Sequence, residues 1–140
     1  MSRNYRYGRN YEYLLISELR SEGWYVIRSA GSHSAVDLVA LHPSDSKVVV
    51  YQIKATKDAQ YAFPQLLDAI NELQEVPEQF ERKAVIFVNG QRYFEVVLNN
   101  NVKCVFESKR KKYQLPCVPV YSAVPFSVYP KRKEPLAEEV

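Results

Sequence analysis

The sequence predicts an α/β domain in which helices flank a central mixed sheet of five strands, in the order αβββαββ. Two observations lead to this prediction. Two segments place apolar residues at helical spacing, and short apolar runs bounded by turn residues lie between and after them. No apolar run approaches the roughly 20 residues that a membrane-spanning helix needs. The 140 residues are most simply one domain that buries roughly two thirds of its surface.

The first helix is expected over residues 10–22, where Asn10 can cap its start and Gly23 lies just past its end. Three strands follow, and the segments between them are short and contain Gly, Pro, Ser and Asp, as turns do. Such short connections join antiparallel neighbours. The three strands are expected over residues 24–29, 35–41 and 48–55.

A second helix is expected to begin at Pro64 and to end near residue 75, with one apolar face. Two further strands, over residues 83–88 and 93–98, are joined by a turn at "NGQ". Residues 102–106 then form either a short strand or an edge. These elements complete the expected mixed sheet.

The C-terminal part of the chain is rich in proline, which lacks the N–H that helices and strands use. The prolines after Pro116 therefore argue against regular structure there. We expect one domain over residues 1–125, followed by a polar tail over residues 126–140.

The net charge is only +3, but the basic residues are unevenly distributed. One cluster is interleaved with tyrosines near the N-terminus, and another lies in the C-terminal third, whereas acidic residues concentrate between residues 68 and 81. Basic patches with aromatic residues suit a polyanion such as nucleic acid, although an ordinary solvated surface explains the charge equally well. The two basic clusters are Arg3, Arg6 and Arg9, and Lys109, Arg110, Lys111 and Lys112.

The two cysteines, Cys104 and Cys117, form no CxxC pair of the kind that binds metals. We expect free thiols in or near the core of a protein from a reducing compartment. The N-terminus lacks the apolar segment of a secretory signal, so we expect a cytoplasmic protein without a membrane span.

Three polar side chains are expected on one face of two neighbouring strands. Gln52 and Lys54 are two residues apart and so point the same way from their strand, and Asp37 lies on the strand beside it. Glu12, near the start of the first helix, is the remaining acid able to reach this patch. Oxygen ligands of this kind suit Mg²⁺, and a lysine beside them can stabilise charge on a phosphate. Alternatively, Asp37 caps a turn or forms an ordinary ion pair with Lys54.

Glu12, Asp37 and the "QIK" triplet, in the order helix, strand, turn, strand, resemble the PD-(D/E)xK nuclease superfamily. More specifically, the chain resembles the archaeal-type Holliday junction resolvases over about residues 5–107. The segments that carry the resemblance are "GRNYE", "GWYVIRSAGS", "VDLVAL", "VYQIKAT" and "RYFEVV". It implies a restriction-endonuclease-like fold and assigns residues 1–125 to a single nuclease domain.

The resemblance implies a structure-selective endodeoxyribonuclease of DNA recombination and repair that resolves four-way junctions as a homodimer. Hydrolysis of the phosphodiester bonds would be symmetric and would depend on Mg²⁺, for which Mn²⁺ can substitute. Two alternatives stay open: a nuclease for other branched DNA, and a junction-binding module with weakened catalysis. The implied source is an archaeal cell, or the host cell of a virus.

The resemblance also implies residue roles. Glu12, Asp37 and Gln52 take the metal-binding positions, Lys54 takes the position of the catalytic lysine, and Ser32 is expected beside the scissile phosphate. Arg28 matches a basic residue near junction DNA, and the two basic clusters are expected to hold phosphates. These contacts should weaken as salt concentration rises.

The chain departs from the resolvase pattern at two positions. Gln52 stands where the third motif usually has an acid, so the metal site has one negative charge fewer and its affinity should fall. Tyr13 follows the first glutamate where relatives often have arginine, and Arg9, one helical turn earlier, is a candidate substitute.

Overall fold

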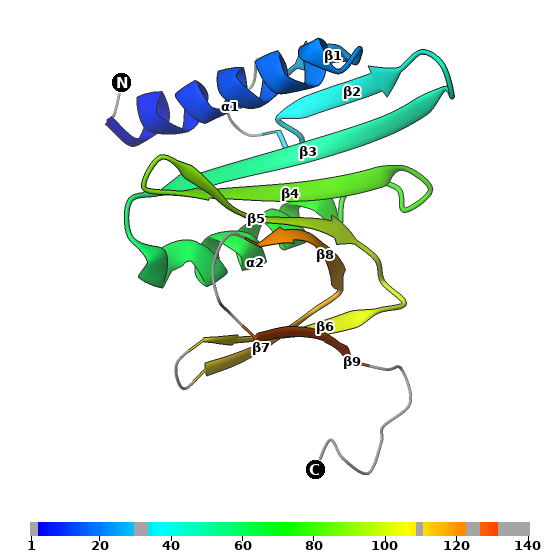
Figure 1. Cartoon of the computed structure of the whole chain (residues 1–140). Coiled ribbons are helices and arrows are strands. Elements are labelled where there is room, and N and C mark those ends of the chain that lie inside the picture. The colour runs from blue at the N-terminus through cyan, green and yellow to red at the C-terminus, as the bar shows by residue number, and fades with distance from the viewer. Residues whose placement is uncertain (1–2, 30–33, 109–110, 123–126, 132–140) are drawn as a thin grey trace.

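The computed structural model describes residues 3–29, 34–108, 111–122 and 127–131, and their side chains over residues 10–29, 34–107 and 112–121 (Figure 1). The predicted order αβββαββ is confirmed for the first seven elements, apart from a short 3₁₀ helix, η1, before the second α-helix. The elements are α1 (Arg3–Ser21), β1 (Tyr25–Arg28), β2 (Leu38–His42), β3 (Lys47–Thr56), η1 (Ala59–Tyr61), α2 (Ala62–Leu73), β4 (Glu81–Val88), β5 (Gln91–Leu98), β6 (Lys103–Ser108), β7 (Lys111–Leu115), β8 (Cys117–Ser122) and β9 (Ser127–Lys131).

The central sheet is mixed, as predicted, but it contains six strands in the order β1-β2-β3-β4-β5-β8. Strands β1 to β3 form the expected antiparallel meander, whereas β3 and β4 are parallel and are connected through α2. The expected number of five strands is wrong because β8 pairs with β5 and extends the sheet. A second sheet, β7-β6-β9, was not predicted.

The prediction of irregular structure after Pro116 is wrong for residues 117–122 and 127–131, which form β8 and β9. Pro119 lies on an edge strand opposite Val96, beside an irregularity in the register, and Pro130 lies on the outer strand of the second sheet. Edge strands tolerate proline because one row of their backbone groups needs no partner in the sheet. Strand β9 falls within the expected tail, of which residues 126 and 132–140 lie outside the described part of the chain.

Helix α1 begins at Arg3, before the predicted cap at Asn10. Glycine inside a helix costs only about 1 kcal/mol relative to alanine, so Gly8 does not prevent the longer helix. The predicted end is confirmed: Gly23 adopts a φ of 93°, and its N–H donates to the Arg20 carbonyl oxygen at 3.1 Å. The extension places Glu12 in the middle of α1, not in its first turn.

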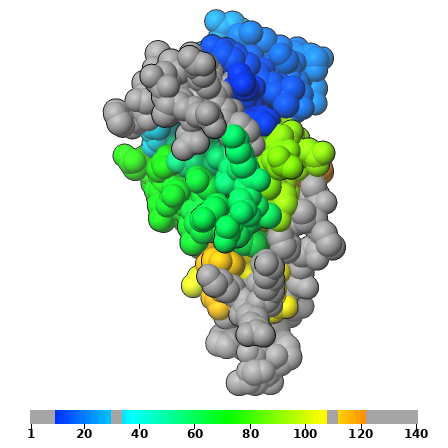
Figure 2. Space-filling model, turned by 90° about the vertical axis from the view of Figure 1, so that its left-hand side faces the viewer, coloured from blue at the N-terminus to red at the C-terminus, as the bar shows by residue number. Residues whose placement is uncertain are grey.

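The two α-helices cover opposite faces of the central sheet (Figure 1). Leu15, Ile16 and Leu19 of α1 pack against one face, with Tyr11 stacked on Phe87 at 4.8 Å between ring centroids. Helix α2 packs against the other face, and the second sheet extends that core, where Phe63 contacts Phe106. Figure 2 shows α1, then β3 and α2, then β6 and β7 in succession along the molecule.

Two local predictions about the core and the turns are confirmed. Cys104 and Cys117 are free, buried thiols. The turn between β4 and β5 is formed by Asn89 and Gly90, which have φ angles of 48° and 86°. Such positive angles at both central positions are typical of a tight hairpin.

Candidate active site

Asp37, Gln52 and Lys54 lie together at one side of the central sheet. Leu38 pairs with Tyr51, and the Asp37 N–H donates to the Tyr51 carbonyl oxygen at 2.8 Å, so Asp37 lies beside Gln52 on the adjacent strand. Along β3, Val49, Tyr51 and Ile53 pack in the core under α1. The side chains of Gln52 and Lys54, which alternate with these, therefore face α2. The predicted convergence of Asp37, Gln52 and Lys54 is confirmed.

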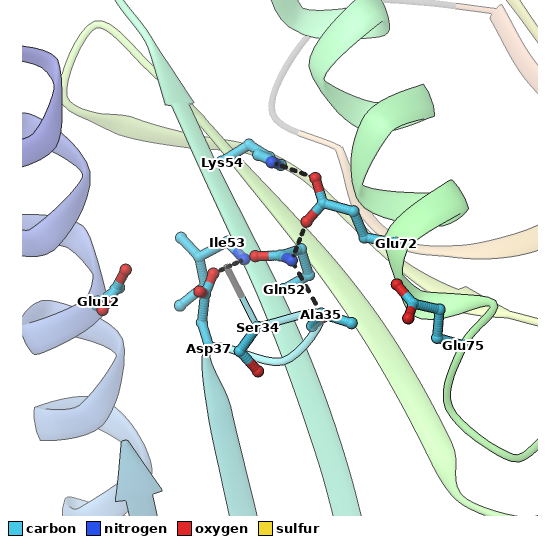
Figure 3. A pocket seen from close by; sticks show the side chains of 9 residues that line it. All are labelled: Glu12, Ser34, Ala35, Asp37, Gln52, Ile53, Lys54, Glu72 and Glu75. Atoms are coloured by element: carbon cyan, nitrogen blue, oxygen red, sulfur yellow. Dashed lines mark hydrogen bonds and ion pairs between the residues drawn. The ribbon is translucent and has the colours of Figure 1, made fainter. Parts of the chain in front are cut away.

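These three side chains line a pocket of about 340 Å³ between α1 and α2 (Figure 3). Most of its lining residues are polar or charged, which suits a charged ligand better than an apolar one. They come from α1, from the segment before β2, from β3, and from α2 and the turn after it. The lining residues are Glu12, Ser34, Ala35, Asp37, Gln52, Ile53, Lys54, Glu72 and Glu75.

Asp37 is held in place by the adjacent strand: its Oδ2 accepts a hydrogen bond from the Ile53 N–H at 2.8 Å. Burial raises the pKa of the Asp37 carboxyl from 3.8 to about 6. This value already includes a smaller increase from the negative charges of Glu12 and Glu72 and the decreases caused by the Ile53 N–H and Lys54. A bound cation would favour the charged form of Asp37 and offset the cost of burying it.

Glu12 reaches the pocket from α1 and forms an ion pair with Arg28 at the end of β1. Its Oε1 lies 3.0 Å from the Arg28 Nε, and the Arg28 guanidinium lies 5.2 Å from the centre of the Tyr13 ring. Arg28, predicted to lie near junction DNA, therefore also holds the acid of the first motif. Tyr13 lies against this ion pair.

Gln52 is only 3% exposed, and its side-chain amide nitrogen has two acceptors. The Nε2 donates to the Ala35 carbonyl oxygen at 3.0 Å and to the Glu72 carboxylate. The amide nitrogen faces Glu72, whereas the amide oxygen lies on the side of Asp37 (Figure 3). An amide oxygen oriented in this way is a neutral ligand for a hard cation.

Lys54 is paired with an acid that the motif analysis did not identify. Its Nζ lies 2.8 Å from Oε1 of Glu72, and Glu75 lines the same pocket one helical turn later. The sequence feature that could have pointed to Glu72 is the concentration of acidic residues between residues 68 and 81. Sequence alone does not show that Glu72 faces β3, because the two residues of the pair lie on different elements.

The oxygen atoms in the pocket suit Mg²⁺ only if the Gln52 amide oxygen is one of the ligands. Among the side chains that the structure describes, no group of three His, Cys, Asp or Glu residues could hold a metal ion by itself. Asp37 and the Gln52 amide nevertheless offer oxygen ligands, and Mg²⁺ usually keeps several waters and binds phosphate oxygens as well. One carboxylate, one amide oxygen, water and substrate are therefore sufficient.

Several predicted DNA-binding residues have side chains outside the described part of the chain, and their roles stay predictions. Lys112 is described: it is 67% exposed on β7, and its Nζ lies 3.5 Å from Oε2 of Glu107. No α-helix in the described ranges is long and apolar enough to cross a membrane. The undescribed side chains are those of Arg3, Arg6, Arg9, Ser32, Lys109, Arg110 and Lys111.

Comparison with known protein families gives one match that covers most of the chain. Residues 3–115 match the model of a family described as archaeal Holliday junction resolvase (Hjc). A search among curated proteins finds no match. The matched range includes Glu12, Asp37, Gln52, Lys54 and Glu72, so it contains the whole pocket.

Proposed function

Because the chain belongs to the archaeal Holliday junction resolvase family, nucleases of the PD-(D/E)xK superfamily, we propose that it resolves four-way DNA junctions by Mg²⁺-dependent hydrolysis as a homodimer. Family membership makes it an endonuclease of DNA recombination and repair that acts on Holliday junctions. The observation that carries the proposed mechanism is the convergence of Asp37, Gln52 and Lys54 in one polar pocket.

Asp37 and the Gln52 amide oxygen are the proposed metal ligands, and Glu12 would bind directly or through water. When bound, the metal would lower the pKa of a water molecule and place positive charge beside the phosphate, and Mn²⁺ could replace Mg²⁺ in this role. The Ile53 N–H holds the Asp37 carboxylate toward the pocket. The ion pair with Arg28 restrains the Glu12 carboxylate at the side of the pocket.

Lys54 is the proposed catalytic lysine. Its ammonium group can donate to the attacking water or to a phosphate oxygen while Glu72 limits its motion. A preorganised cation of this kind stabilises negative charge that develops on the phosphate in the transition state. Ser32 is expected to lie beside the scissile phosphate.

Basic residues that do not themselves line the pocket would hold the phosphates of the junction arms. We assign this role to Arg28 and to the two basic clusters, Arg3, Arg6 and Arg9, and Lys109, Arg110, Lys111 and Lys112. Loss of one phosphate contact reduces the slope of log affinity against log salt concentration by about 1. Lys112→Ala should show this reduction. Lys47→Ala, at the opposite end of β3 from Lys54, is the matched control.

Two copies of the chain would place two pockets on opposed strands of a junction, which explains symmetric cutting by so small a domain. Mixing the protein with excess Asp37→Ala tests this arrangement. Mixed dimers should cut one strand and leave nicked junctions, whereas a monomeric enzyme would give two independent cuts at a rate proportional to active protein.

The deciding experiment incubates the purified protein with a labelled four-way junction, linear duplex or single strand, with Mg²⁺ or with EDTA. We expect paired cuts in the junction that depend on Mg²⁺. Equal cutting of duplex would reject junction selectivity and leave a nuclease for other DNA. Junction binding without cutting under any divalent ion would instead support the junction-binding module with weakened catalysis.

A further inference from the structure

The environment of Gln52 is built for an amide and not for a carboxylate. Its Nε2 donates to two oxygen acceptors, the Ala35 carbonyl and the Glu72 carboxylate. The side chain is almost fully buried, so water cannot replace these contacts. A carboxylate at position 52 would place an oxygen against both acceptors, at a cost that buried polar atoms rarely tolerate.

Both oxygens of Glu72 are engaged by β3. One accepts from the Gln52 amide and the other lies 2.8 Å from the Lys54 ammonium, so a single acid of α2 contacts both polar residues of the "QIK" triplet (Figure 3). Glu72 belongs to none of the sequence motifs that carried the family resemblance. Its carboxylate is about one third exposed, so it lies at the wall of the pocket.

We propose that Glu72 is the positioning residue that makes Gln52 a metal ligand. By holding the amide nitrogen, Glu72 keeps the amide oxygen on the side of Asp37 and prevents the amide from turning over. The same carboxylate returns to the pocket the negative charge that is lost when the third motif carries glutamine. Gln52 and Glu72 together thus supply the oxygen ligand and the negative charge that one glutamate would supply at position 52.

Glu72 acts through Gln52 and Lys54 and is not itself assigned as a ligand. Each of its oxygens already accepts from a donor on β3, and among the described side chains it forms no three-acid metal cluster with its neighbours. Partners of metal ligands typically change metal affinity by 10- to 100-fold when they are replaced. This role rests on the proposed Mg²⁺ dependence.

The test measures Mn²⁺ binding to the EDTA-treated protein by electron paramagnetic resonance, without DNA. Glu72→Gln keeps the shape of the side chain but loses its charge and leaves two donors competing for one oxygen. We expect Mn²⁺ affinity to fall about tenfold or more. Glu75→Gln removes the same charge from the same pocket and is the matched control, for which we expect a much smaller loss.

The exchanged pair provides a second test. Gln52→Glu alone should lower the thermal midpoint, because two carboxylates then face each other. The double variant Gln52→Glu/Glu72→Gln restores a donor and an acceptor between positions 52 and 72, so that only the Ala35 carbonyl loses its donor. It should bind Mn²⁺ at least about threefold more tightly than Glu72→Gln. Thermal midpoints of all variants show whether each is folded, and Glu72→Asp, with its shorter side chain, should also lose affinity.

Three results would overturn the role of Glu72: a loss under about threefold in a folded Glu72→Gln protein, an equal loss in Glu75→Gln, or no recovery in the exchanged pair. In each case, if Asp37→Asn abolishes Mn²⁺ binding, the proposed metal site itself would still be supported. By contrast, an unmutated protein that neither binds Mn²⁺ nor cuts a junction would overturn the proposed function itself.

Discussion

The Ile53 N–H donates to Oδ2 of Asp37 at 2.8 Å, so a backbone group of β3 fixes the acid that precedes β2. This contact links the second and third motifs through the sheet itself. The side chain of Ile53 is buried under α1, so its N–H cannot move without disturbing the core. The position of the acid is therefore set by strand register and packing.

Asp37→Asn should reduce junction cleavage by at least about 100-fold, because an amide supplies less negative charge to the metal than a carboxylate. Asn can still accept the hydrogen bond from Ile53, so the fold should persist. The measurements are the single-turnover cleavage rate and junction affinity in EDTA. Retained binding with lost cleavage is the expected result, and unchanged cleavage would exclude Asp37 from the metal site.

The raised pKa of Asp37 predicts that metal binding depends on pH. Because the proposed metal would bind the carboxylate form and the metal-free carboxyl has a pKa of about 6, Mn²⁺ affinity should fall about tenfold per pH unit below that value. Above about pH 7 it should level off. Titration of the metal-free protein with Mn²⁺ at several pH values tests this dependence, and a flat profile between about pH 5 and pH 7 would contradict it.

The same pKa predicts how stability changes in the absence of metal. The folded protein holds the Asp37 proton more tightly than the unfolded chain does, since the pKa rises from 3.8 to about 6 on folding. This group therefore favours folding fully below about pH 3.8, and its contribution is lost as pH rises through about 6. In thermal unfolding with EDTA, Asp37→Asn should lose this part of the pH dependence.

Replacing Lys54 should slow junction cleavage without weakening junction binding. Lys54→Met keeps the length of the side chain but removes its charge, so cleavage should fall about 100-fold while junction affinity stays within about threefold. The comparison variant is Lys47→Met, at the other end of β3, which should cleave normally. A large loss of junction affinity in Lys54→Met would instead assign Lys54 to DNA binding.

The ion pair between Glu12 and Arg28 should contribute measurably to stability. Both side chains are less than one third exposed, and the Nε–Oε1 distance is 3.0 Å, so a coupling energy of about 1 kcal/mol is expected. A double-mutant cycle with Glu12→Gln and Arg28→Gln in urea unfolding measures it. The more exposed pair Glu107–Lys112, at 3.5 Å, is the control and should give a value near zero.

The amino-acid sequence alone predicts the order of the first seven elements and the shared face of Gln52 and Lys54. Helical spacing, turn residues and the alternation of side chains along a strand are local properties, so they can be predicted without knowing what packs against the strand. The position of Asp37 beside Gln52 followed from the short connections of the meander. The family resemblance added Glu12.

Tertiary structure alone decided what surrounds these residues. Glu72 lies 20 residues after Gln52, and only the crossing of α2 over β3 brings the two into contact. The ion pair between Glu12 and Arg28 depends in the same way on how α1 packs beside β1. Likewise, β8 and β9 form because they pair with β5 and β6. This long-range pairing outweighs the local preference of proline for irregular structure. The glutamine of the third motif therefore has a defined partner, and that partner is not visible in the motif itself.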